Sequence, residues 1–261
     1  MLRSLLRALL NERQRQLLGR RLHHLRAWPL RKDLNALALH YGTDKWGRHY
    51  YTQHYQVLLG PLRTRPLRML EIGVGGYTDP RAGGGSLRMW KRYFPKARIT
   101  ALDLYDKSWW EEPRIRIHQG SQTDIAVLDR IVKEDGPFDL IIDDGSHVST
   151  HIIATFEHLF PSLKDGGHYI IEDTQTSYWK EFGGDEHDRT GTHTSMGYFK
   201  SLVDGLNHEE IRDPARQEGP FDRSIRSIHF HHNLVVICKG SNEEGSNLGP
   251  QRISQPRVSH A

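Results

Sequence analysis

The sequence contains very little cysteine and no long apolar run. Its 261 residues include a single cysteine, Cys238, which excludes an internal disulfide framework and a cysteine-rich zinc site. No stretch approaches the roughly 18 apolar residues that a membrane-spanning helix needs. Arginines interrupt every N-terminal apolar segment, so we expect no secretory signal. These absences favour a protein of the reducing cytoplasm with no integral membrane segment.

Positive charge is concentrated in the first 32 residues. This segment holds nine Arg or Lys side chains and one acidic side chain, Glu12, so its net charge is +8. Because the whole chain carries +4, the remainder carries −4. A basic surface for nucleic acid on the main body is therefore not supported, and we expect no nucleic-acid partner.

The same N-terminal segment has leucines at helical spacing, with arginines on the opposite face, which predicts a basic amphipathic arm over residues 1–35. One interpretation is contact with an anionic membrane surface or a partner. The favoured one is packing on its own domain or across a homodimer or higher homo-oligomer. The leucines are Leu2, Leu5, Leu6, Leu9, Leu10, Leu17, Leu18, Leu22 and Leu25.

From residue 67 onward, short apolar runs alternate with helical stretches. Strands are expected at 68–73, 98–105, 115–121, 138–144 and 167–173, and helices at 86–94, 124–134, 149–164 and 195–207. Two final strands, around 224–233 and 234–240, read as an antiparallel hairpin. This order predicts an α/β fold with a doubly wound, mostly parallel, seven-stranded sheet and a C-terminal antiparallel hairpin. We expect one domain over 36–240 and a disordered tail over 241–261.

A glycine-rich turn follows the first expected strand. The segment "LEIGVGG" places Glu71 before Gly73, Gly75 and Gly76, where backbone must approach a ligand closely. The second strand ends near Asp103, which is suitably placed to accept hydrogen bonds from both ribose hydroxyls. Together the two features indicate a nucleoside-like cofactor.

The turn differs from a dinucleotide site. A G-x-G-x-x-G turn normally leads directly into a helix that holds pyrophosphate, whereas "GGYTDPRAGGGS" puts a long loop before the helix near Ser86. The E-x-G-x-G turn and the acid after the second strand instead resemble class I S-adenosylmethionine-dependent methyltransferases. A nicotinamide-dependent oxidoreductase remains the alternative.

Two further strands end in paired acids, at "IIDDGSH" and "YIIEDT". If these strands are neighbours, their carboxyl ends meet at one edge of the sheet, where adjacent strands are about 4.8 Å apart. Asp143 and Asp144 would then lie close to Glu172 and Asp173. Such crowded carboxylates are stabilised by a cation, and oxygen-only ligands favour Mg²⁺, with Mn²⁺ or Ca²⁺ as possible substitutes.

His147 follows Asp144 by three residues, where it could take a proton from a substrate hydroxyl as a general base. A zinc site through His147 and His151 is the less favoured alternative, because no third soft ligand is evident.

Together with "YGTDKWG" and "GGGSLRMW", these motifs resemble the metal-dependent sugar O-methyltransferases of the mycinamicin type and of mycobacterial methylmannose polysaccharide synthesis. The resemblance covers roughly residues 36–240. It implies transfer of a methyl group from S-adenosylmethionine to a hydroxyl of a mannose-type oligosaccharide or of the deoxysugar of a glycosylated natural product. It also implies Mg²⁺ on Asp144, Glu172 and Asp173, with His147 as catalytic base.

The cofactor contacts that the resemblance and the motifs imply are Thr43, Glu71, Gly73, Gly75, Ser86, Asp103, Gln122 and Asp144. Thr43 could instead belong only to a helix C-terminus, and Ser86 could be a helix N-cap. In the loop after the last acid pair, Tyr178 and Trp179 could stack on a sugar or cover the sheet. Other functions that stay open are a nucleic-acid methyltransferase recruited by the arm, although no N-P-P-Y or D-P-P-Y segment occurs, and a binding module without activity.

Overall fold

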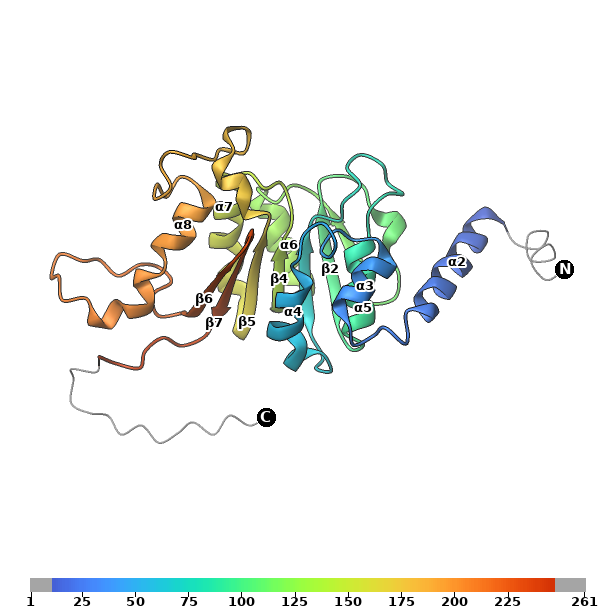
Figure 1. The fold of residues 1–261 in the computed structure, drawn as a ribbon, viewed down its shortest axis with the longest axis horizontal. Coiled ribbons are helices and arrows are strands. Elements are labelled where there is room, and N and C mark those ends of the chain that lie inside the picture. Colours follow the sequence, from blue (N-terminus) through green and yellow to red (C-terminus); the bar gives the residue numbers. More distant parts are fainter. Residues whose placement is uncertain (1–10, 247–261) are drawn as a thin grey trace. The chain divides into compact units, whose positions relative to one another are not determined.

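The structure, a computed structural model, describes residues 11–246. The chain divides into two compact units, residues 1–145 and 146–261, each taken by itself below. In both units short helices connect the strands (Figure 1). No described helix is long and apolar enough to cross a membrane.

The first unit is built on four parallel strands in the order β3-β2-β1-β4. Its elements in chain order are α2 (Glu12–Arg26), α3 (Leu34–Tyr41), α4 (Thr52–Leu59), β1 (Arg68–Ile72), α5 (Gly85–Tyr93), β2 (Arg98–Asp103), β3 (Ile115–Gln119), α6 (Ile125–Asp135) and β4 (Phe138–Asp143). The apolar runs of β1 and β4 are buried, as expected for central parallel strands. Asp124 begins α6 by accepting hydrogen bonds from the amides of Ala126 and Val127.

The described part of the N-terminal arm, α2, packs on its own unit. The contacts come from polar side chains: Arg20 donates to the Trp109 carbonyl oxygen over 2.7 Å, and His24 Nδ1 lies 2.6 Å from the Tyr41 hydroxyl. Leu22 and Leu25 of the expected apolar stripe are instead 48% and 63% exposed. Arg20 and His24 thus hold α2 by polar contacts, and Leu18 of the stripe is half-buried. Leu2 to Leu10 and the side chain of Leu17 lie outside what the structure describes.

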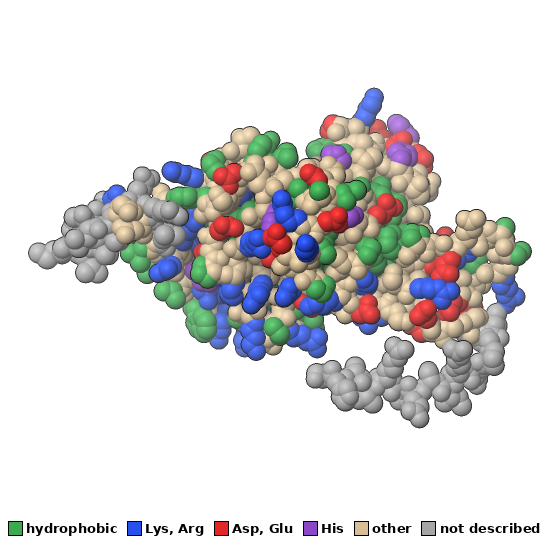
Figure 2. All heavy atoms as spheres, turned by 180° about the vertical axis from the view of Figure 1, so that it is seen from behind, with side chains coloured by type: hydrophobic (Ala, Val, Ile, Leu, Met, Phe, Trp, Pro, Cys, Tyr) green, Lys and Arg blue, Asp and Glu red, His purple; other side chains and the backbone are tan. Residues whose placement is uncertain are grey.

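Basic side chains are unevenly spread on the surface. Figure 2 shows Lys and Arg side chains gathered along the lower part of the first unit, with Asp and Glu side chains among them nearer the middle. Apart from this basic region, the face shown in Figure 2 carries both positive and negative side chains.

The second unit has three antiparallel strands in the order β5-β7-β6. Its elements are α7 (Ser149–Leu159), β5 (Leu163–Glu172), α8 (Ser195–Ser201), β6 (Ile225–His231) and β7 (Leu234–Lys239). The hairpin turn contains Asn233 with a left-handed φ of 59°. Phe156 is the centre of the core, with edge-to-face ring contacts to Tyr169, Phe199 and Phe221.

These strands form the expected seven-stranded mixed sheet, so the predicted α/β fold class is confirmed. Several bounds differ. The strand expected at 98–105 ends at Asp103, and the helix expected to reach 164 ends at Leu159, just before a short 3₁₀ turn that contains Pro161. The helix expected at 195–207 ends at Ser201. Residues 241–246 form no helix or strand, yet Asn242 is buried and donates to the Asp222 carbonyl oxygen. The predicted domain bounds and the tail beyond residue 246 stay predictions.

Candidate functional site

The glycine turn after β1 requires glycine at its first position. Gly73 has a φ of 93°, and a Cβ there would overlap the carbonyl oxygen of Asp144. Its amide donates to the Leu102 carbonyl oxygen over 2.8 Å. The backbone that follows β1 therefore runs directly against the backbone that follows β4, with no room for a side chain.

Asp103, at the end of β2, braces this turn. One carboxylate oxygen accepts a hydrogen bond from the Val74 amide and the other from the Tyr105 amide, each over 2.9 Å. The side chain is partly exposed. Because each carboxylate oxygen has a second lone pair, these bonds are compatible with the predicted ribose contact.

Glu71 lies inside the unit. Its side chain has no solvent exposure and faces the Lys45 ammonium, at 3.5 Å, and the side chains of Ser86 and Trp90. Burial raises the pKa of the Glu71 carboxyl to about 7, and Lys45 acts in the opposite direction. Glu71 thus lies buried beneath the glycine turn, with its carboxylate facing protein side chains. Its direct contact with a cofactor stays a prediction.

The two acids at the end of β4, Asp143 and Asp144, have different surroundings. Asp143 is buried and accepts a hydrogen bond from Gln122 Nε2 over 3.3 Å, and burial raises its pKa to about 7. Asp144 is partly exposed, and one of its oxygens lies 2.7 Å from Lys45 Nζ. Only Asp144 of this pair therefore presents part of its carboxylate to solvent, while Asp143 fixes the Gln122 side chain that the cofactor prediction includes.

Thr43 lies near the start of α5, the helix that contains Ser86. Helix α3 ends at Tyr41, and the Thr43 amide donates to the Ala38 carbonyl oxygen over 3.1 Å. A Cβ added to Gly85 would lie 3.5 Å from the Thr43 amide nitrogen, so this turn adjoins the start of α5. Ser86 is not the N-cap, because α5 begins at Gly85 after Gly84. Thr43 thus follows the end of α3, and its cofactor contact stays a prediction, whereas the N-cap interpretation of Ser86 is wrong.

In the second unit, His147 and Asp173 lie close together. The distance from His147 Nε2 to Asp173 Oδ2 is 3.7 Å, and both residues have left-handed backbone conformations, with φ values of 58° and 53°. Thr176 Oγ1 donates to both of their carbonyl oxygens, over 2.9 and 3.0 Å. A buried hydroxyl thus holds two strained backbone positions together.

Glu172 is the last residue of β5 and is 2% exposed. It pairs in register with Leu234 of β7. The predicted magnesium set therefore takes Asp144 from the first unit and Glu172 and Asp173 from the second, and it stays a prediction. Its donor chemistry suits the ion, since carboxylate oxygens are the ligands that Mg²⁺ prefers.

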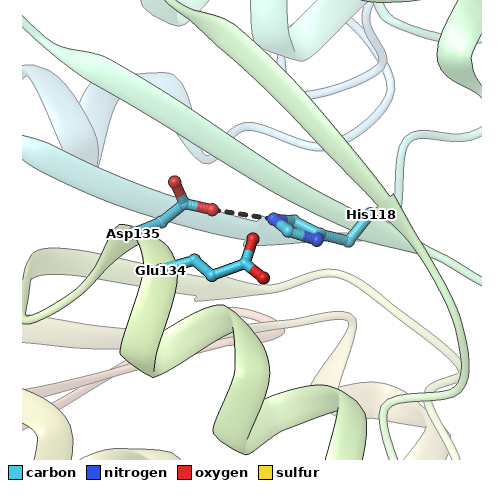
Figure 3. Close-up of side chains that lie close together, drawn as sticks. All are labelled: His118, Glu134 and Asp135. Atoms are coloured by element: carbon cyan, nitrogen blue, oxygen red, sulfur yellow. Dashed lines mark hydrogen bonds and ion pairs between the residues drawn. The ribbon is translucent and has the colours of Figure 1, made fainter.

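Other groups of potential ligands are explained by protein contacts. His151 Nδ1 lies 3.0 Å from the Ser146 hydroxyl, which gives this imidazole a partner of its own. Figure 3 shows His118, Glu134 and Asp135 grouped in the first unit, with His118 Nε2 2.7 Å from Asp135. Arg116 pairs with both carboxylates. Because the Arg116 guanidinium already pairs with both carboxylates, this group is an ion-pair network.

Sequence reasoning missed Lys45. It is 1% exposed and lies between Glu71 and Asp144. The block "YGTDKWG" contained the residue, but a lysine in a polar segment is normally solvent-exposed, and nothing local indicated that it would be buried. The side chains of Tyr178 and Trp179, in contrast, are 37% and 46% exposed, so part of each ring remains accessible to solvent.

No protein-family model matches the chain. Among curated proteins, a mycinamicin VI 2''-O-methyltransferase of Micromonospora griseorubida is 47% identical over 82% of this chain and 54% of its own length. An 8-demethyl-8-alpha-L-rhamnosyl tetracenomycin-C 2'-O-methyltransferase of Streptomyces olivaceus is 49% identical over 80% of this chain and 55% of its own length. The chain thus spans about half the length of these relatives.

Solved structures agree. MycE methyltransferase from the mycinamycin biosynthetic pathway, in complex with Mg and SAH, superposes with a TM-score of 0.80 and 46% identity. The match covers 85% of this chain and 58% of MycE. A MycE complex that also contains mycinamycin VI gives a TM-score of 0.76 over 82% of this chain and 56% of MycE. The chain therefore belongs to the same family as these sugar O-methyltransferases and has their class I methyltransferase fold.

Proposed function

We propose that this chain transfers a methyl group from S-adenosylmethionine to a hydroxyl of a sugar, with Mg²⁺ as a second cofactor. The observation that carries the proposal is the 47% identity to a sugar O-methyltransferase over 82% of the chain. The glycine turn braced by Asp103 supports a nucleoside cofactor at the ends of β1 and β2.

In this proposal Gly73, Gly75 and Asp103 position the cofactor, and Asp144, Glu172 and Asp173 hold the ion. When bound, Mg²⁺ supplies positive charge that makes a nearby hydroxyl easier to deprotonate. His147 Nε2 accepts the proton of the sugar hydroxyl. Bound S-adenosylmethionine would supply an activated methyl group for that oxygen, with S-adenosylhomocysteine as the leaving product and a methyl ether on the sugar.

The Asp173 carboxylate lies next to this base, with Oδ2 3.7 Å from His147 Nε2. Tyr178 and Trp179, which are partly exposed and lie shortly after Asp173, are candidates to stack on the sugar ring. We also propose that the protein is cytoplasmic and forms a homodimer or higher homo-oligomer.

The test is a screen with methyl-labelled S-adenosylmethionine against mannosides, rhamnosides and glycosylated macrolides, with Mg²⁺ or with EDTA. We expect labelled product with at least one class of acceptor, and only when Mg²⁺ is present. Asp144→Asn and Glu172→Gln are expected to abolish metal-dependent transfer. Full activity of these variants in EDTA would show that the carboxylates are structural.

A further inference from the structure

Lys45 is a buried cation that nothing in the proposed mechanism uses. The residue follows α3, and its side chain is 1% exposed. Its Nζ atom lies 2.7 Å from Asp144 Oδ2 and 3.5 Å from Glu71 Oε1. Burying an ammonium is costly unless it is paired, so these two carboxylates explain how the lysine is tolerated there.

The three side chains form one network with unequal exposure. Glu71 is fully buried, whereas the Asp144 side chain is 25% exposed. The network carries a formal charge of −1, because one ammonium serves two carboxylates. Lys45 therefore neutralises the inner acid and holds the outer one in place.

The backbone of Asp144 is fixed as well. Its amide donates to the Ile72 carbonyl oxygen over 3.0 Å, and its carbonyl oxygen is packed against Gly73. With the backbone held by β1 and one carboxylate oxygen held by Lys45, the orientation of the carboxylate is determined from both ends.

An ammonium on one oxygen limits how the carboxylate can bind a metal. A cation that used both oxygens would contact Oδ2 at about 2.4 Å, while Lys45 Nζ lies 2.7 Å from the same atom. Two cations on one oxygen repel each other strongly in a partly buried site. Coordination through Oδ1 alone avoids this repulsion.

We propose that Lys45 makes Asp144 a one-oxygen ligand and thereby makes the site select Mg²⁺ over Ca²⁺. Mg²⁺ requires compact octahedral coordination by single oxygens, whereas Ca²⁺ accepts more oxygens and is often held by both oxygens of a carboxylate. The inference rests on the proposed function, since it takes Asp144 as a ligand of the ion. Lys45 is thus a positioning residue that acts through Asp144.

The test compares Mg²⁺ and Ca²⁺ binding by isothermal titration calorimetry on the full chain. The informative variant is the double substitution Lys45→Met with Glu71→Gln. It keeps the formal charge of −1 but removes the ammonium from Asp144 Oδ2. We expect the ratio of Mg²⁺ to Ca²⁺ affinity to fall about tenfold, chiefly because Ca²⁺ gains a second oxygen.

Two further proteins complete the design. Glu71→Gln alone keeps the contact between Lys45 and Asp144, so its affinity ratio should equal that of the wild type. Lys45→Met alone leaves two acids without a cation and is judged first by circular dichroism and thermal unfolding. If it folds, it should bind both ions more tightly and show the same loss of selectivity as the double variant.

The outcomes separate the two proposals. A double variant that binds Mg²⁺ and Ca²⁺ with the wild-type ratio overturns the role of Lys45 and leaves the metal-dependent function standing. A wild-type protein that binds neither ion overturns the proposed metal site itself. A loss of selectivity confined to variants that lack Lys45 supports the inference.

Discussion

His147 and Asp173 are held as a pair, with Nε2 of the imidazole 3.7 Å from a carboxylate oxygen. Both residues have φ values in the left-handed region, which is unfavourable for residues other than glycine. Thr176 compensates by donating its hydroxyl to the carbonyl oxygens of both residues. Strain that is maintained in this way is typical of a functional position.

Replacing His147 by alanine should lower kcat by about 10² to 10⁴ at neutral pH, because the acceptor hydroxyl loses its base. Binding of S-adenosylmethionine, measured by calorimetry, should stay nearly intact. His151→Ala is the matched control, since that imidazole lies against Ser146. A His147→Ala enzyme with the wild-type rate would remove this residue from the mechanism.

Thr176→Val should destabilise the second unit by about 1–3 kcal/mol, because two carbonyl oxygens lose a buried donor. It should also lower kcat by loosening His147. The control is Thr174→Val: Thr174 is fully buried, and its hydroxyl has no hydrogen-bond partner among the described residues. That change should be neutral or slightly stabilising. Denaturant unfolding checks both variants, and equal effects would argue against the role given to Thr176.

Gly73→Ala should lower the free energy of unfolding by more than the strain of a positive φ alone explains. Strain in the left-handed region costs about 1 kcal/mol, and here the added Cβ also overlaps the Asp144 carbonyl oxygen. We expect a loss of at least about 2 kcal/mol in the free energy of unfolding and greatly weakened cofactor binding. Gly166→Ala is the control, because it has a φ of 78° with nothing within 4 Å. Similar losses for both variants would contradict the crowding at Gly73.

The sequence predicted the sheet well because alternating apolar runs and turn residues are local patterns. Buried β1 and β4, and the hairpin of β6 and β7, follow directly from such runs. What local patterns could not show was which partner each polar side chain meets. Lys45 follows α3 and Asp144 follows β4, 99 residues later in the chain, so their ion pair forms only in the folded protein.

The same limit explains two other results. Asp143 and Asp144 are adjacent in sequence and looked equivalent, yet alternation along the strand turns Asp143 inward to Gln122. The leucine pattern of the arm predicted an apolar contact, but it did not predict the polar contacts that Arg20, His23 and His24 of α2 make. The spacing of apolar residues along a helix identifies its apolar face, but it does not identify the part of the protein that the helix contacts.

The docking of α2 should weaken in acid. Burial, reinforced by Arg92, lowers the pKa of His24 to about 3, whereas an unfolded histidine titrates near 6.5. The folded protein therefore binds fewer protons here than the unfolded chain between these values. The stability contributed by neutral His24 is fully present above pH 6.5 and is lost progressively as the pH falls toward 3.

His24→Asn tests this directly, because the amide oxygen of asparagine can replace Nδ1 next to the Tyr41 hydroxyl without titrating. Between pH 7.5 and pH 5, the wild-type protein should lose more unfolding free energy than the variant, as measured by denaturant titration with tryptophan fluorescence. Trp109 and Trp110 report on the contact, since the Arg20 guanidinium lies 4.6 and 4.4 Å from their ring centroids. His187→Asn, at a histidine whose side chain is 90% exposed, should keep the wild-type pH dependence. Equal losses in the wild type and His24→Asn would place the acid sensitivity elsewhere in the fold.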